Sequence, residues 1–181
     1  GLFERAIALD PEQAAYYNNL RMTLRDLGRH PAATQACRAA LKRRADYPEA
    51  WNNLGNVYFA QAEYSLARGA YREAIRARRD YAKAWLNLAR AEYALQAQEP
   101  AQRALRRGLR LAPSAPAWRL LAQIDNEARR HHDALMAIEQ ALASATESGE
   151  YLPIKATILR NLSRYEEALA IQQARVEEVP S

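Results

Sequence analysis

The chain repeats itself at an interval of about 34 residues, and this period limits the folds open to it more than any other feature. The clearest copy opens on Trp51-Asn52-Asn53-Leu54-Gly55-Asn56-Val57-Tyr58, which fits W-x-x-L-G-x-x-Y, and continues with Ala67, Tyr71 and Ala74. Matching residues precede it (Tyr17, Leu20, Ala33, Cys37, Ala40) and follow it (Trp85, Leu88, Ala89, Ala101, Leu105, Gly108; then Trp118, Leu121, Ala122, Ala134, Ile138, Ala141). A unit this short buries its apolar face only against its neighbours, so the period predicts a stack.

Helices are the expected content of each unit. Trp51, Leu54 and Tyr58 recur at helical spacing, and the second half of the copy does the same. Ala, Leu, Arg and Glu dominate the composition, whereas the strand-favouring Val, Ile, Thr and Phe are scarce. Small residues such as Gly55 let helix backbones approach closely. Turn signals fall between the helices, at Asp46-Tyr47-Pro48 for example.

These motifs resemble the tetratricopeptide repeat, and the resemblance covers nearly the whole chain. It implies an all-α, right-handed superhelical solenoid of antiparallel helix pairs, with about five repeats plus a half repeat. We expect one domain, 1–181, that is a fragment of a longer protein. Its predicted parts are the second helix of a truncated repeat (1–13), full repeats (14–47, 48–81, 82–114 and 115–148) and a degenerate last repeat (149–181) in which Pro153 and Lys155 disturb the first helix.

The resemblance also implies a binding surface. In this family the first helix of each pair lines a concave groove and the second helix forms the convex back. Carried over position by position, the predicted peptide-binding groove contains Asn19, Asn52, Asn53, Asn56, Phe59, Lys83, Asn87, Arg90, Tyr93, Arg119 and Gln123.

Asparagine recurs at one groove position, as Asn19, Asn53 and Asn87. An amide side chain both donates and accepts, so a regular row of them suits the backbone of an extended peptide. Similar asparagine ladders hold substrate peptides in the repeats of O-linked N-acetylglucosamine transferase. The row ends at Leu120 and Ile154. The alternative is that these residues are polar only because they are exposed.

Two further groove features bear on the choice of ligand. Phe59 and Tyr93 either form pockets for apolar ligand side chains or pack against the neighbouring hairpin. The carboxylate clamp of heat-shock-chaperone cofactors is matched at only two of its five positions, by Asn53 and Lys83, so capture of a chaperone C-terminus is not expected.

Positive charge is concentrated in the first part of the chain. The net charge is +5, and residues 1–114 hold 19 Lys and Arg against 11 Asp and Glu. Two periodic rows on the second helices form a predicted basic convex face, which contains Arg38, Lys42, Arg72, Arg76, Arg106 and Arg110. Such a band suits an acidic partner or a polyanion, or it is merely a solvated helix surface. Aromatic residues for base stacking are not interleaved with it, which disfavours nucleic acid.

Signals for chemistry are missing from the sequence. Cys37 occupies an apolar slot and is expected to be buried. His131 and His132 are adjacent and point apart on a helix, with no suitably spaced further ligands, so no metal site is expected. Phosphate loops and nucleophile elbows are absent. We therefore expect no catalytic residues, no cofactor and no small-molecule substrate.

The leading hypothesis for function is a scaffold that binds an extended peptide or a partner protein in the groove. One alternative is the substrate-recruiting arm of a larger enzyme, such as a glycosyltransferase or a sulfotransferase. Another is polyanion binding through the basic convex face. Self-association through exposed repeat ends is a further option. No apolar run approaches the length that spans a bilayer, and a cytoplasmic location is favoured, although a targeting segment can be missing from a fragment.

Overall fold

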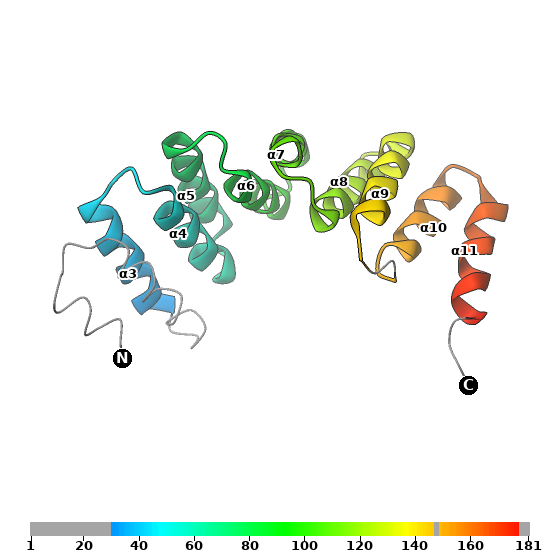
Figure 1. The fold of residues 1–181 in the computed structure, drawn as a ribbon, viewed down its shortest axis with the longest axis horizontal. Helices are drawn as coiled ribbons and strands as arrows, with labels where there is room; N and C mark the ends of the chain where they lie inside the picture. Colours follow the sequence, from blue (N-terminus) through cyan, green and yellow to red (C-terminus); the bar gives the residue numbers. More distant parts are fainter. Residues whose placement is uncertain (1–29, 147–148, 178–181) are drawn as a thin grey trace. The chain divides into compact units, whose positions relative to one another are not determined.

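The computed structural model describes residues 30–146 and 149–177, and within these ranges the chain folds into helices joined by short turns (Figure 1). The helices are α3 (His30–Arg43), α4 (Pro48–Ala60), α5 (Tyr64–Ala77), α6 (Ala82–Ala94), α7 (Gln98–Leu111), α8 (Ala115–Glu127), α9 (His131–Ser144), α10 (Leu152–Asn161) and α11 (Tyr165–Glu177). The described residues contain no strand.

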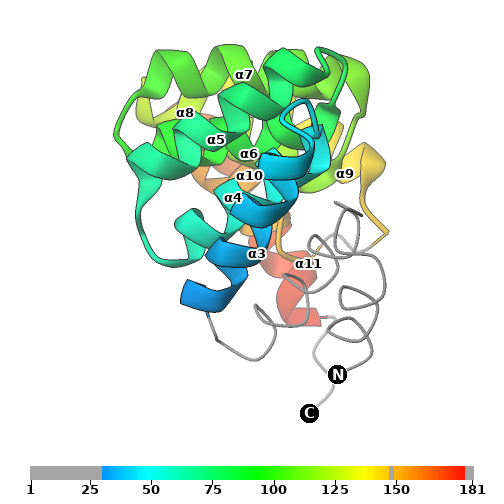
Figure 2. The ribbon, with the colours of Figure 1, turned by 90° about the vertical axis from the view of Figure 1, so that its left-hand side faces the viewer.

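The chain divides into two compact units, residues 1–111 and 112–181. In unit 1, α4 pairs with α5 and α6 pairs with α7; α3 packs against α4, α5 packs against α6, and α4 also contacts α6 (Figures 1 and 2). In unit 2, α8 pairs with α9 and α10 with α11, and α9 packs against α10. Consecutive helices thus form pairs, and pairs stack on pairs within each unit.

The predicted all-α stack of antiparallel helix pairs is confirmed. The division of the chain into repeats at particular residues stays a prediction. The expected truncated helix at 1–13 and the first helix of the repeat at 14–47 lie outside the described residues.

The turn inside each described pair is built the same way. One residue in each turn has a positive φ: Ala62 (59°), Gln96 (62°), Arg129 (58°) and Ser163 (61°). At the first turn, the N–H of Ala62 bonds the carbonyl of Phe59 at 3.0 Å and the N–H of Glu63 bonds that of Tyr58 at 2.9 Å. The same two bonds recur at the other three turns. This is the Schellman arrangement, which ends a helix through one left-handed residue.

Glycine is the residue best suited to that left-handed position, yet none of the four turns has one. Gly28 stands 34 residues before Ala62 in the sequence, at the matching position, but lies outside the described residues. The four turns therefore carry backbone strain that the stacked helices hold in place.

Replacing Ala62 by Gly should relieve this strain. A left-handed L-residue costs about 1–2 kcal/mol, and the extra freedom of unfolded glycine takes back part of the gain, so we expect Ala62→Gly to raise the free energy of unfolding by about 0.5–1 kcal/mol. Ala60→Gly, in the last turn of α4, should lower it by a similar amount. Thermal and urea denaturation followed by circular dichroism measure both. Destabilisation by both variants would show that the turn is not strained.

Close helix packing in unit 1 depends on two glycines. A Cβ placed on Gly55 of α4 would lie 2.5 Å from the ring of Tyr71 on α5, and one placed on Gly108 of α7 would lie 2.6 Å from Leu86 on α6. Tyr71 is among the largest fully buried side chains, and Ala67 and Ala74 beside it on α5 have no exposed surface. The small residues thus allow the approach that the sequence predicted.

Gly55 and Gly69 offer a matched pair of substitutions in adjacent helices. Gly55→Ala forces the Tyr71 ring out of its place and should lower the free energy of unfolding by about 1–3 kcal/mol. A Cβ on Gly69 meets nothing within 4 Å, so Gly69→Ala should stabilise the protein by up to about 1 kcal/mol through helix propensity. Equal effects of the two variants in urea denaturation would show that the close contact is not limiting.

In unit 1, a tryptophan ties each of the pairs α4–α5 and α6–α7 to the turn before it. The indole Nε1 of Trp51 donates to the carbonyl of Ala45, and that of Trp85 donates to the carbonyl of Arg79, both at 2.8 Å.

The last pair differs from the others because α10 is shorter. Pro153 lies in its first turn, where a missing N–H costs nothing, so the predicted disturbance appears as a shortened helix rather than a broken one.

No described helix combines the length and the apolar character needed to cross a membrane.

Candidate functional site

The first helices α4 and α6 lie side by side in unit 1, and asparagines link them. The Nδ2 of Asn87 on α6 donates to the Oδ1 of Asn52 at 3.0 Å and to the Oδ1 of Asn56 at 3.1 Å. Asn52 is buried, whereas Asn56 and Asn87 are half-buried. Three of the predicted groove residues are therefore joined in one network.

A tyrosine from the second helix completes the network. The hydroxyl of Tyr71 donates to the Oδ1 of Asn56 at 2.9 Å. Burial raises the pKa of Tyr71 above its ordinary value of 10.0, and the positive charge of Arg90 opposes that rise. The hydroxyl thus stays protonated near neutral pH and remains a donor. Because Asn52 is buried and the Oδ1 of Asn56 also accepts from Tyr71, the amide of Asn87 is fixed in orientation.

Arg90 lies one turn after Asn87 and is also held in place. Its guanidinium carbon sits 4.8 Å from the ring centroid of Phe59, and that ring meets Tyr64 edge-on with centroids 5.1 Å apart. Phe59 is half-buried while Arg90 is exposed. The aromatic pair therefore packs within its own hairpin and at the same time supports a cation.

We call the predicted groove residues of α4 and α6 that are exposed or half-buried the first-helix face: Asn53, Asn56, Phe59, Lys83, Asn87, Arg90 and Tyr93. Glu49, which stands 34 residues before Lys83 at the same repeat position, is half-buried too and is paired with Arg78. Asn53 and Tyr93 are half-buried and contact their surroundings, and Lys83 is exposed. Two predicted groove residues, Arg119 and Gln123, belong to α8 in unit 2; both are half-buried, and the Nε2 of Gln123 donates to Glu127 at 3.1 Å. Asn19 lies outside the described residues.

Each acid of α4 and α6 is paired with arginines on the α5 side. Glu49 pairs with Arg78 at 2.8 Å. Glu92, only 2% exposed, pairs with Arg72 at 2.8 Å and lies 3.7 Å from Arg68. This buried ion pair was not predicted. Its one signal in the sequence is that Glu92 stands where the neighbouring repeat has the motif tyrosine, Tyr58.

The predicted basic convex face is exposed throughout, but its members differ. Arg38 donates to the hydroxyl of Tyr58 at 2.9 Å, which is the same link from a second helix to the next first helix that Arg72 makes with Glu92. Arg76 pairs with Glu73 on its own helix at 2.9 Å. Lys42, Arg106 and Arg110 form no ion pair among the described residues. Part of this face therefore joins neighbouring pairs.

Substitutions of Arg72 and Arg76 test whether an arginine that links two helix pairs contributes more to stability than one that is merely exposed. Arg72→Ala leaves the Glu92 carboxylate buried without its closest partner, and since the Arg72 side chain is 57% exposed we expect a loss of about 1–3 kcal/mol. Arg76→Ala, at a 79% exposed side chain, should change stability by less than about 0.5 kcal/mol. Urea denaturation compares them, and a loss for Arg72→Ala no larger than for Arg76→Ala would count against the joining role.

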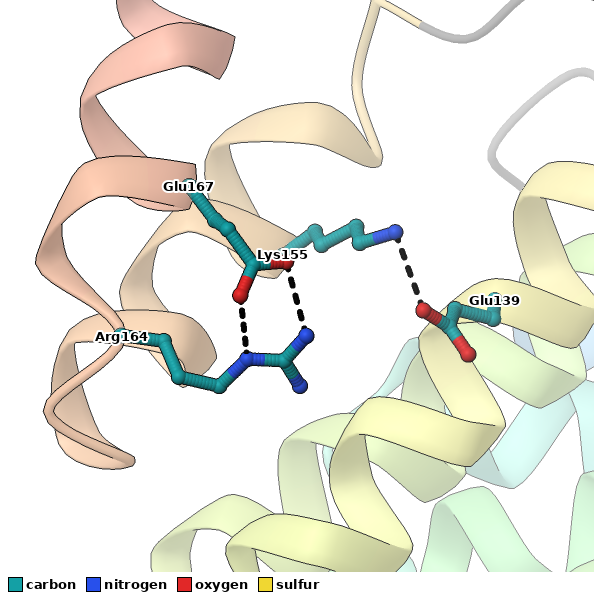
Figure 3. A network of polar contacts seen from close by, with 4 residues as sticks. All are labelled: Glu139, Lys155, Arg164 and Glu167. Carbon is teal, nitrogen blue, oxygen red and sulfur yellow. Dashed lines mark hydrogen bonds and ion pairs between the residues drawn. The ribbon is translucent and has the colours of Figure 1, made fainter.

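Unit 2 holds its own polar links. Asp125, 1% exposed, pairs with Arg130 at 2.9 Å, and the Oδ1 of Asn126 accepts from Asn161 at 2.9 Å. Figure 3 shows a second set, in which Lys155 on α10 reaches Glu139 on α9 at 3.0 Å.

The same view shows a bidentate contact at the start of α11, where Arg164 donates to both oxygens of Glu167 at 2.6 and 2.7 Å (Figure 3). The hydrogen bonds from Arg164 hold the pKa of Glu167 below its ordinary value. These contacts join the α10–α11 turn to α11, and together with the Lys155–Glu139 pair they serve packing within the unit.

Other candidate chemistry gains no support. The predicted burial of Cys37 is confirmed, since its side chain has no exposed surface. Within 30–146 and 149–177, no cluster of His, Cys, Asp and Glu is arranged to hold a metal ion. His131 lies 2.9 Å from the Oδ1 of Asn126 through its Nδ1, in a contact between the start of α9 and the end of α8.

Comparison with known proteins agrees with this architecture. A sequence model of the tetratricopeptide repeat matches residues 1–48, 22–81 and 52–116. The crystal structure of MamA protein superposes with a TM-score of 0.84 at 19% identity, covering 92% of each chain. YrrB, described as a TPR protein with an unusual peptide-binding site, gives 0.82 at 18% identity over 98% of this chain and 92% of its own.

Pseudomonas aeruginosa pilF gives a TM-score of 0.85 at 17% identity, covering 96% of this chain and 81% of its own. At such identities these likenesses show the fold alone. No curated protein matches the chain in sequence.

Proposed function

The chain belongs to the tetratricopeptide repeat family, and from that premise we propose that it is a protein-interaction scaffold that holds an extended segment of a partner against the first-helix face of unit 1. Members of this family bind peptides or protein partners, and YrrB is described as having a peptide-binding site. The use of the first-helix face in this chain is the part that we infer from its residues.

The observation that carries the proposal is the fixed amide of Asn87. Its Nδ2 is committed to Asn52 and Asn56, and among the described residues no donor bonds its Oδ1. An extended peptide brings unpaired backbone N–H groups, which need acceptors. An acceptor whose orientation is already set loses little entropy on binding, so it favours such a ligand.

The surroundings of Asn87 favour a peptide over a small polar ligand. Phe59 and Tyr93, at equivalent positions near the ends of α4 and α6, supply half-buried aromatic surface for ligand side chains. Lys83 and Arg90 flank Asn87 along the same side of α6. The face therefore offers backbone recognition, apolar contact and charge over the length of a short extended segment.

Panning a displayed library of random 12-residue peptides against the full chain tests the proposal. We expect enriched peptides to bind Asn87→Leu about three- to tenfold more weakly than the wild type, because one hydrogen bond is worth about 0.5–1.5 kcal/mol. Leu is the natural residue at this slot in the next copy, at Leu120, so the variant should keep its helices.

Arg76→Ala, on second helix α5, provides the matched control and should bind as the wild type does. Fluorescence anisotropy with labelled peptides measures the affinities, and circular dichroism confirms that each variant is folded at the assay temperature. Failure to enrich any peptide, or equal binding by folded Asn87→Leu, would overturn the proposal.

A further inference from the structure

The acidic residues of α4 and α6 are paired with arginines, whereas the basic residues of these helices are not. Their only acidic residues are Glu49 and Glu92, and their only basic residues are Lys83 and Arg90. Glu92 forms an ion pair with Arg72 of α5, and Glu49 forms one with Arg78, the residue that follows α5. Among the described residues neither Lys83 nor Arg90 is in an ion pair, so the first-helix face keeps two uncompensated positive charges.

Resting on the proposed function above, we propose that the first-helix face selects acidic peptide segments and that Arg90 is the residue that receives a ligand carboxylate. Arg90 differs from an ordinary surface arginine because the Phe59 ring lies against its guanidinium group. Among the described residues, no side chain or backbone carbonyl accepts a hydrogen bond from Arg90. Its N–H donors therefore remain able to grip a carboxylate with two parallel bonds.

The neighbours of Arg90 add to its anion selectivity. Tyr71, which lies within electrostatic range of Arg90, is a neutral phenol near pH 7, and burial raises its pKa further, so no negative phenolate competes for the guanidinium group. Glu92 is two residues further along α6, about 200° around the helix, and its carboxylate is taken by Arg72 and Arg68. A carboxylate brought by a ligand is therefore the partner that this cation lacks.

The spacing of the two cations suits a short acidic segment. Lys83 and Arg90 are seven residues apart on α6, which places them on one side of the helix with a rise of about 10 Å between them. An extended peptide covers that distance in about three residues. Asn87 lies between the two cations, where its free acceptor meets the ligand backbone while the cations meet acidic side chains.

The test compares selections from a displayed library of random seven-residue peptides on the full chain, as the wild type and as Arg90→Met. Methionine keeps an unbranched apolar stem against Phe59 but removes the charge. We expect peptides enriched on the wild type to hold an excess of Asp and Glu, and we expect this excess to fall on Arg90→Met. Arg76→Met should select the same peptides as the wild type.

Anisotropy with the strongest peptide and its Glu→Gln counterpart then gives the preference directly. We expect the wild type to bind the Glu peptide about tenfold more tightly than its Gln counterpart, and Arg90→Met to bind the two peptides almost equally. Arg90→Lys keeps the charge but loses the planar group, so its preference for the Glu peptide should be intermediate. The wild-type preference should shrink as salt is added.

The possible failures are distinct. Peptides enriched without an acidic excess, or bound equally to their Gln counterparts, would overturn the acidic selectivity and leave the scaffold proposal standing. A preference that survives in Arg90→Met would overturn the assignment to Arg90. Failure to enrich any peptide on the wild type would overturn the scaffold proposal and this inference together.

Discussion

The contact between Gly55 and the ring of Tyr71 is the interaction on which the candidate site depends. Because Gly55 has no side chain, α5 lies close enough to α4 for the Tyr71 hydroxyl to reach Asn56, the next residue of α4. Asn56 in turn accepts from Asn87 on the next first helix. A packing contact inside one hairpin thus sets the orientation of an amide on the neighbouring hairpin, so the residues that stabilise the packing also shape the candidate site.

Polar contacts also link neighbouring helix pairs in unit 1. Second helices reach forward to the next first helix, through Arg38 to Tyr58 and through Arg72 to Glu92. Glu92 stands at the buried position that Tyr58 fills one repeat earlier, and there it pairs with Arg72, while Lys83 and Arg90 have no carboxylate partner among the described residues. Because the acid of α6 is used in joining the helix pairs, the two cations of that helix remain uncompensated.

Much of the fold was predictable from the sequence, because the period and the apolar spacing specify helix pairs and their stacking. The same pattern placed Cys37 in the core. It did not reveal the left-handed turn residues, since Ala62 and Gln96 lack the glycine that normally marks this backbone conformation. Periodicity assigns a residue to a slot but not a direction to its side chain. For this reason the sequence predicted a row of equivalent asparagines but not the bonds from Asn87 to Asn52 and Asn56. It likewise predicted two rows of basic residues on the second helices but not their different partners.

A crystal structure of the full chain with a peptide enriched on it tests the central claim most directly. We predict an extended peptide against α4 and α6, with one backbone N–H about 2.9 Å from the Oδ1 of Asn87 and a ligand carboxylate on the guanidinium group of Arg90. A peptide seated instead on the second helices, with Asn87 and Arg90 in contact with solvent only, would contradict the claim.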